Sequence, residues 1–253
     1  MILKAAVTSA SIALTALAGS ASAEDPDLTA KSVVLVHGAF ADGSAWSGVV
    51  PFLEQAGLDV ISVQNPLDSL AGDVAFTNRA IARAQGPVVL VGHSWGGQVI
   101  TEAGLNDKVH ALVYVAAYAP NAGQSLGEAA ELDTFPAPGI AALQQDDAGY
   151  FFLPDDAMAS LFAHDVPKAD ADIMAATQGL LNSEALGQPV SHAAWEHKPS
   201  FYVIAGEDYM TPTALQRQFA KKIGATAREV DASHAVAVSQ PKFVADMIIE
   251  AAK

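Results

Sequence analysis

The chain alternates between short, continuously apolar runs and longer segments with apolar residues at helical spacing. The runs at 33–37 and 88–92 consist largely of Val and Leu, which is typical of parallel strands covered on both faces. In full, the pattern predicts strands at 33–37, 58–63, 88–92, 111–115, 201–205 and 226–230, and helices at 45–56, 70–84, 98–105, 212–223 and 241–251. Such alternation predicts an α/β fold with a doubly wound, mostly parallel sheet, whose ligands bind beyond the carboxyl ends of the strands.

The alternation breaks once, between positions 120 and 199, where no convincing strand is found. The segments 153–162 and 170–181 carry apolar residues at helical spacing, so we expect a helical cap inserted after the fourth strand. Insertions over the catalytic end of such a sheet usually shape the substrate pocket, although aromatic residues there can equally pack the cap on the core. The side chains expected to bind substrate are Phe152 and Trp195 of the cap, with His37 and Phe40 of the loop after the first strand.

The first 23 residues have the pattern of a secretory signal. Lys4 precedes an apolar stretch that ends at Ala18, and the small residues Ala21, Ser22 and Ala23 follow. We expect cleavage after Ala23, a single mature domain over 24–253, and a periplasmic or secreted location. The alternative is an uncleaved anchor, but the apolar stretch is too short to span a bilayer comfortably, so no membrane association is expected after cleavage.

The net charge of −15 argues against partners that carry phosphate. Such a surface repels nucleic acid and anionic membranes, and it favours solubility outside the cytoplasm. The chain contains no Cys, so it needs no disulfide in an oxidising compartment. No feature of the sequence sets an oligomeric state.

The most informative motif follows the strand predicted at 88–92. Gly92, His93, Ser94, Trp95 and Gly96 form the pattern Gly-x-Ser-x-Gly between a strand and a helical segment. This is the context of a nucleophile elbow, in which a serine hydroxyl is held clear of the sheet on a sharp turn. The alternative is a serine in an ordinary turn between a strand and a helix.

The other parts of a hydrolytic site follow in the expected order of nucleophile, acid and histidine. Glu207 and Asp208 come directly after the strand predicted at 201–205, and His234 lies on a late loop. Upstream, Gly38 follows the first strand, where a second donor to an oxyanion is expected.

These motifs resemble those of the α/β-hydrolase superfamily, over essentially the whole mature chain. The segments that begin at His37, Gly92 and Ser233 are most similar to small serine esterases related to plant methyl-ester-cleaving esterases and hydroxynitrile lyases. The resemblance implies that Ser94 is the nucleophile, Asp208 the acid and His234 the base. It also implies that the backbone amides of Ala39 and Trp95 form the oxyanion hole.

The resemblance further implies cleavage of small, fairly apolar carboxylic esters through an acyl-enzyme, with no metal or organic cofactor and a small-molecule ester as partner. A lyase on the same scaffold is the first alternative. The plant lyases carry Thr where this chain has Gly38, and Lys where it has Ala235, and both departures favour ester hydrolysis. Lactonase activity is a second alternative and a non-enzymatic receptor for small ligands is a third, although export away from cytoplasmic partners argues against the receptor.

Overall fold

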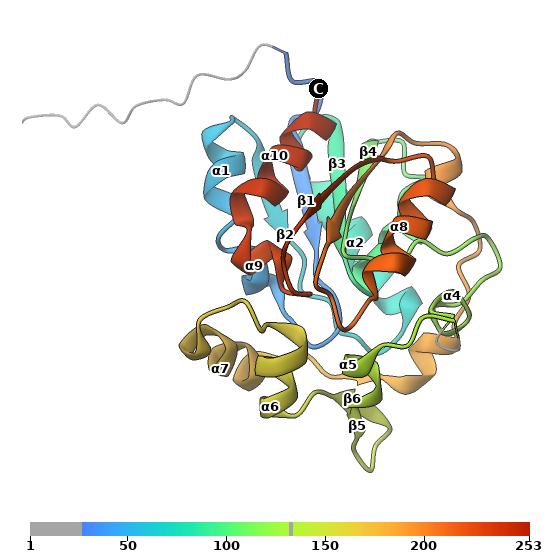
Figure 1. Ribbon diagram of the computed structural model, residues 1–253. Helices are drawn as coiled ribbons and strands as arrows, with labels where there is room; N and C mark the ends of the chain where they lie inside the picture. Colours follow the sequence, from blue (N-terminus) through green and yellow to red (C-terminus); the bar gives the residue numbers. More distant parts are fainter. Residues whose placement is uncertain (1–26, 132–133) are drawn as a thin grey trace, which may run out of the picture.

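The computed structural model describes residues 27–131 and 134–253 (Figure 1). The predicted signal segment and its cleavage site lie outside these residues. A six-stranded sheet forms the centre of the molecule, and every pairing between its neighbouring strands is parallel. Its strands, in sequence order, are β1 (Ser32–Val36), β2 (Asp59–Ser62), β3 (Val88–His93), β4 (Val109–Val115), β8 (Ser200–Ala205) and β9 (Thr226–Val230). The predicted doubly wound parallel sheet is therefore confirmed.

Helices cover both faces of the sheet because the strands are apolar on both faces. Alternate residues such as Val34 and Leu90 contribute to one core cluster, and their neighbours Val33 and Val89 contribute to another. The first face is covered by α2 (Leu70–Arg83), α3 (Gly96–Ala103) and α8 (Thr213–Lys222), and the second by α1 (Val50–Gln55) and α10 (Pro241–Ala251).

The strand order β2-β1-β3-β4-β8-β9 places a topological switch point between β1 and β3. The chain leaves β1 toward one face and β3 toward the other, so a crevice opens beyond their carboxyl ends. The loop that carries Ala39 and the turn that carries Ser94 both lie at this point.

The helix predicted at 45–56 is divided into the 3₁₀ turn η1 (Gly43–Trp46) and α1. Pro51 lies in the first turn of α1, where its missing N–H costs no helical hydrogen bond. The same ring cannot continue a helix from the preceding turn, so a new helix begins at Val50, one residue before the proline.

The cap is only partly helical, which corrects the expectation of a cap without strands. It contains a three-stranded antiparallel sheet of very short strands, β5 (Gln144–Gln145), β6 (Tyr150–Phe152) and β7 (Leu181–Asn182). Strands of two or three residues are too short to produce a periodic pattern. The remaining elements are α4 (Leu126–Ala129), α5 (Pro138–Ala141), α6 (Asp155–Ala157), the π turn η2 (Met158–Phe162), α7 (Lys168–Thr177), and the 3₁₀ turns η3 (Ser183–Gly187) and η4 (Ala194–Glu196).

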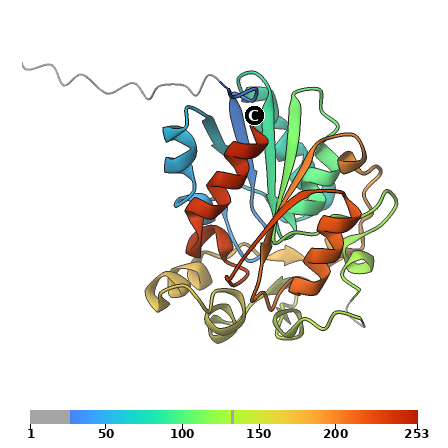
Figure 2. The ribbon, with the colours of Figure 1, turned by 45° about the horizontal axis from the view of Figure 1, so that its top comes forward.

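Figures 1 and 2 both show the cap gathered at one end of the sheet, away from the C-terminus. The short helix α9 (Val236–Ser239) precedes α10 at the same end as the cap. No helix within 27–131 or 134–253 is long and apolar enough to cross a membrane.

Candidate active site

Ser94 lies at the sharp turn between β3 and α3. Its φ is 53°, a conformation that costs a residue other than glycine about 1 to 3 kcal/mol. The turn is held because the Ser94 amide donates to the Val115 carbonyl at 3.2 Å, and the Ser94 carbonyl accepts from the Gly97 amide at 2.9 Å. The surrounding structure therefore imposes the strained turn that the sequence motif predicts.

Two glycines allow the elbow to pack so tightly. A Cβ on Gly92 would collide with the Gly96 carbonyl, and one on Gly97 would collide with the Tyr118 carbonyl. Strand and helix thus approach closer than any side chain would permit. This close packing brings Ser94 to the floor of the space beneath the cap.

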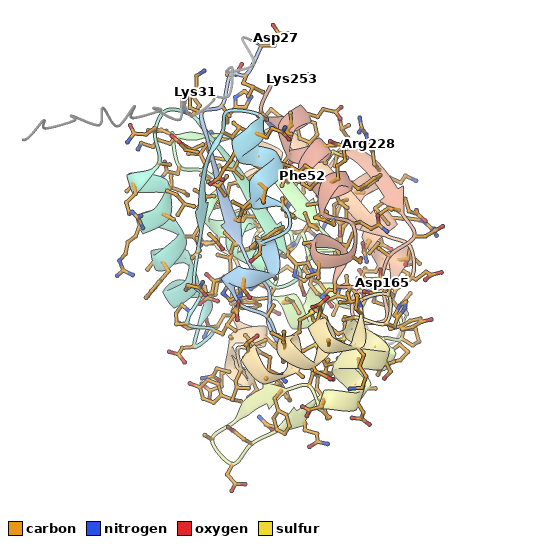
Figure 3. All side chains as sticks on the ribbon, turned by 90° about the vertical axis from the view of Figure 1, so that its left-hand side faces the viewer. Asp27, Lys31, Phe52, Asp165, Arg228 and Lys253 are labelled. Atoms are coloured by element: carbon orange, nitrogen blue, oxygen red, sulfur yellow. The ribbon has the colours of Figure 1, made fainter. Side chains whose placement is uncertain are left out.

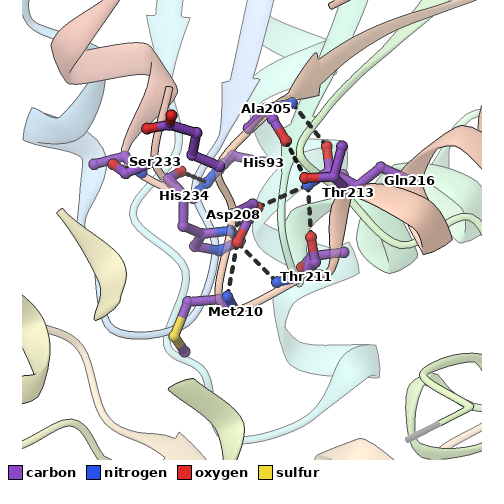
Figure 4. A network of polar contacts seen from close by, with 12 residues as sticks. His93, Ala205, Asp208, Met210, Thr211, Thr213, Gln216, Ser233 and His234 are labelled. Carbon is purple, nitrogen blue, oxygen red and sulfur yellow. Dashed lines mark hydrogen bonds and ion pairs between the residues drawn. The ribbon is translucent and has the colours of Figure 1, made fainter. Parts of the chain in front are cut away.

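His234 and Asp208 form a buried pair (Figure 4). The His234 Nδ1 atom lies 2.7 Å from the Asp208 Oδ2 atom, and the two side chains are 1% and 0% exposed. A carboxylate can only accept, so Nδ1 carries the proton and Nε2 is left as the basic nitrogen of a neutral imidazole. The structure thereby brings together two predicted site residues that are 26 positions apart in sequence.

The Asp208 carboxylate is held by three further donors. Oδ1 accepts from the amides of Met210 at 2.7 Å and Thr211 at 2.9 Å, and Oδ2 accepts from the Gln216 side chain at 2.8 Å. Gln216 is fully buried, and its own Oε1 accepts from the Ala205 amide. Sequence reasoning missed Gln216, although a glutamine on the apolar face of the helix predicted at 212–223 was a usable signal.

The neighbouring acid Glu207 points away from this pair. Glu207 is exposed, whereas Asp208 is buried, so only the second acid faces His234. Asp231, the other carboxylate near the His234 loop, is also exposed.

His93, the residue before Ser94, connects the elbow to the His234 loop. Its Nε2 atom donates to the His234 carbonyl at 2.9 Å, and the two rings lie 4.6 Å apart. Burial holds the pKa of His93 well below its ordinary value, so the ring is neutral and serves as a hydrogen-bond donor.

Ala39 and Trp95 line the same pocket as Ser94. Both residues are buried. Across the described ranges, neither amide donates a hydrogen bond to a protein group. Buried amides are usually paired, so two free donors beside one hydroxyl are suited to receive a ligand oxygen.

An apolar pocket lies above Ser94, between the core and the cap. None of its lining side chains is charged, and the hydroxyl-bearing ones are Ser94, Tyr118 and Thr211. Its other lining residues are Ala39, Phe40, Trp95, Leu126, Gly127, Ala130, Ile140, Leu143, Phe151, Leu181, Leu186 and Met210.

Of the four side chains expected to bind substrate, Phe40 lines this pocket and the other three do not. Phe152 alternates with Phe151 along β6, and Phe151 takes the inward position. Trp195 turns its indole N–H to the Pro120 carbonyl.

His37 is buried behind the loop after β1 rather than in the pocket. Its Nε2 atom accepts from the Asn65 amide at 2.9 Å, and its Nδ1 atom lies 2.8 Å from the Gly38 carbonyl. Burial lowers the pKa of His37, so the neutral ring holds the backbone of this loop.

The described residues contain no group of three His, Cys, Asp or Glu side chains arranged to hold a metal ion.

A comparison with known protein families identifies the class to which this fold and this site belong. The model of the alpha/beta hydrolase family matches residues 33–247, so the chain belongs to this family. The chain is 28% identical over 244 residues to the alpha/beta hydrolase nvfD of Aspergillus novofumigatus, covering 87% of this chain and 96% of that protein. It is also 28% identical over 254 residues to a pyrethroid hydrolase of Sphingobium wenxiniae, covering 88% of each.

Solved structures agree on the fold. Polyneuridine aldehyde esterase matches with a TM-score of 0.78 and 22% identity, covering 88% of this chain and 100% of that one. An extracellular alpha/beta-hydrolase from a Paenibacillus species matches with a TM-score of 0.74 and 21% identity, covering 88% and 99%. The protein is thus an alpha/beta hydrolase, and a pyrethroid hydrolase is among the proteins to which its sequence is similar.

Proposed function

We propose that this protein is a serine hydrolase that cleaves carboxylic esters of small, apolar substrates through an acyl-enzyme intermediate. The observation that carries the proposal is the position of Ser94. Its strained turn lies at an apolar pocket together with two free amides, and His93 links this turn to the loop of the buried His234–Asp208 pair.

The chemistry follows from these groups. Ser94 attacks the ester carbonyl while His234 takes the hydroxyl proton through Nε2, and Asp208 stabilises the imidazolium that forms. The amides of Ala39 and Trp95 receive the oxyanion, a contribution of roughly 3 to 4 kcal/mol for each donor in other hydrolases. His234 then returns the proton to the leaving alcohol, and water repeats the cycle on the acyl group.

The apolar lining of the pocket favours uncharged substrates. A charged group placed among the apolar lining residues would lose its hydration without gaining a partner. Residues of both the core and the cap line this pocket, which suits a small organic ester rather than a polymer.

Gly38 supports hydrolysis over a lyase reaction. A Cβ at this position would lie 2.7 Å from the Ser94 Cβ atom and 2.9 Å from the His93 carbonyl oxygen. A threonine, which the plant lyases carry here, would not fit without displacing the proposed nucleophile.

The test is a fluorophosphonate probe applied to the purified protein, together with turnover of p-nitrophenyl esters of increasing acyl length. We expect labelling at Ser94, and we expect Ser94→Ala to lose both labelling and turnover. Mandelonitrile and simple lactones, run beside the esters, distinguish the alternative reactions. An alanine variant with full ester turnover would contradict the serine mechanism.

We also propose that the protein is exported and begins at Glu24 after removal of the signal segment. The small residues Ala21 and Ala23 suit signal peptidase. Intact mass of the exported protein tests this, and a species that retains Met1 would favour the anchor instead.

A further inference from the structure

One short segment of the cap, residues 162–165, contacts both loops that carry the His234–Asp208 pair. The segment begins at the last residue of η2. The Phe162 carbonyl accepts from the Ala235 amide at 3.1 Å, and the Asp165 Oδ2 atom accepts from the Ser233 amide at 3.0 Å. The residues on both sides of His234 are therefore bonded to the cap.

The same segment holds the Asp208 loop. The His164 Nε2 atom lies 2.9 Å from the Glu207 carbonyl, and because a carbonyl only accepts, the ring donates. The His164 ring also lies 5.0 Å from the Tyr209 ring. The segment thus contacts the residues on either side of Asp208, the Glu207 backbone by a hydrogen bond and the Tyr209 side chain by its ring.

Phe162 adds a contact with the imidazole itself. Its ring meets the His234 ring edge to face at 4.7 Å, and Phe162 is 1% exposed. The His234 ring can therefore not swing toward the cap without displacing a buried aromatic side chain.

We propose that Asp165 and His164 are positioning residues of the hydrolase: from the cap, they hold the two loops so that His234 and Asp208 stay in hydrogen-bond contact. This inference rests on the proposed function, because it gives the pair a task in turnover. The physical reason is that both side chains lie on irregular loops, whose geometry depends on hydrogen bonds from outside the loop. A displacement of 1 Å in such a pair can cost as much as about 100-fold in rate.

The charge of Asp165 suits this task. Partial burial works to raise its pKa, but hydrogen bonds from Ser233, from Ser239 and from its own backbone together outweigh burial and hold the pKa below its ordinary value. The carboxylate is therefore ionised at neutral pH, and ionised acceptors make stronger hydrogen bonds than neutral ones. In Figure 3, Asp165 lies where the cap meets the C-terminal part of the core.

The experiment compares removal of each side chain with a replacement that keeps its hydrogen bond. Asp165→Ala and His164→Ala lose the contact, whereas Asp165→Asn keeps an acceptor and His164→Gln keeps a donor. The matched control is Asp170→Ala, which removes an exposed carboxylate from α7 of the same cap.

We expect each alanine variant to lower kcat by about tenfold with KM changed by less than about twofold. The Gln variant should recover kcat to within about twofold of wild type, the Asn variant should recover part of the loss because its acceptor is neutral, and the control should match wild type. If the two residues served only stability, the alanine variants would have a lower melting temperature. They would not lose kcat with KM unchanged, and the Asn and Gln variants would not restore kcat.

The labelling rate of Ser94 by the fluorophosphonate is measured on every variant, which separates the two proposals. Alanine variants with wild-type kcat and labelling would overturn the positioning role alone, as would a folded Asp165→Asn no better than Asp165→Ala. A wild-type protein that is neither labelled nor active would overturn the proposed function, and the positioning role with it.

Discussion

The Asp73 carboxylate accepts a 2.7 Å hydrogen bond from the indole of Trp95, the residue directly after Ser94. Its other oxygen accepts from the Leu67 amide at 2.9 Å. Asp73 and Trp95 are both essentially inaccessible to solvent. A buried carboxylate on α2 therefore anchors the side chain of Trp95, which lines the pocket beside the proposed nucleophile.

Removal of this carboxylate should weaken both the fold and the site. Asp73→Ala leaves two buried N–H groups without an acceptor, which should cost roughly 2 to 4 kcal/mol of unfolding free energy. Turnover should also fall, because the Trp95 amide is no longer held in place. Urea denaturation and steady-state kinetics measure the two effects. Asp68→Ala, an exposed carboxylate nearby, is the control and should change stability by less than about 1 kcal/mol.

Asp73 should also give stability a characteristic pH dependence. Burial raises its pKa to about 6, although hydrogen bonds from Trp95 and Leu67 oppose the rise. The folded protein therefore binds the carboxyl proton of Asp73 more tightly than the unfolded chain does. The stability that this proton contributes is present at pH 4 and is lost as pH rises through 6. In Asp73→Asn this loss of unfolding free energy, on the order of 2 kcal/mol, should be absent.

The quantity to measure is the difference in unfolding free energy between wild type and Asp73→Asn from pH 4 to pH 7. Contributions of other groups, including the buried His37 and His93, are common to both proteins and cancel. A difference that stays constant over this range would show that Asp73 does not titrate as its burial implies.

The two adjacent acids should differ sharply in activity. Asp208→Asn leaves His234 without its ionised partner and should lower turnover by about 10² to 10⁴. Glu207→Gln changes an exposed side chain and should leave turnover nearly unchanged. Kinetics on both variants, with circular dichroism to verify folding, test this. A crippled Glu207→Gln beside an active Asp208→Asn would reverse the assignment.

The elbow should not tolerate a side chain at Gly92. In Gly92→Ala the new methyl group collides with the Gly96 backbone, which cannot move without shifting α3 from the sheet. We expect a loss of about 3 kcal/mol of stability or more. Gly187→Ala is the matched control, since a Cβ there meets no atom within 4 Å. Thermal denaturation of the two variants gives the comparison.

Ester turnover should rise from acidic to neutral pH, because His234 accepts the serine proton only as a neutral imidazole. EDTA should leave the rate unchanged, since the proposed mechanism requires no metal. A pH series of kcat/KM on a neutral ester, repeated with EDTA, measures both. Activity lost to EDTA and restored by added metal would contradict this mechanism.

The sequence by itself determined the central sheet and the order of the site residues. The runs of Val and Leu predict buried parallel strands, because a strand that is apolar on both faces is stable only where both faces are covered. The motif around Ser94 predicts its own turn because glycine and close packing are local requirements. Strand β9 and helix α10 were predicted with the bounds that the structure has.

Only the tertiary structure decided which side chains meet. The sequence placed Glu207 and Asp208 side by side, and the packing of their loop turned the second toward His234 and the first to solvent. Phe152 was expected in the pocket, but the pleat of a three-residue strand assigned that place to Phe151.

The contacts of Asp73 with Trp95, of Gln216 with Asp208 and of Asp165 with Ser233 join residues 22, 8 and 68 positions apart. Such contacts leave no periodic signal, because they depend on how helices, cap and loops pack against one another. Local chemistry therefore predicted the strands and the elbow, while the support around His234 and Asp208 emerged only from the folded arrangement.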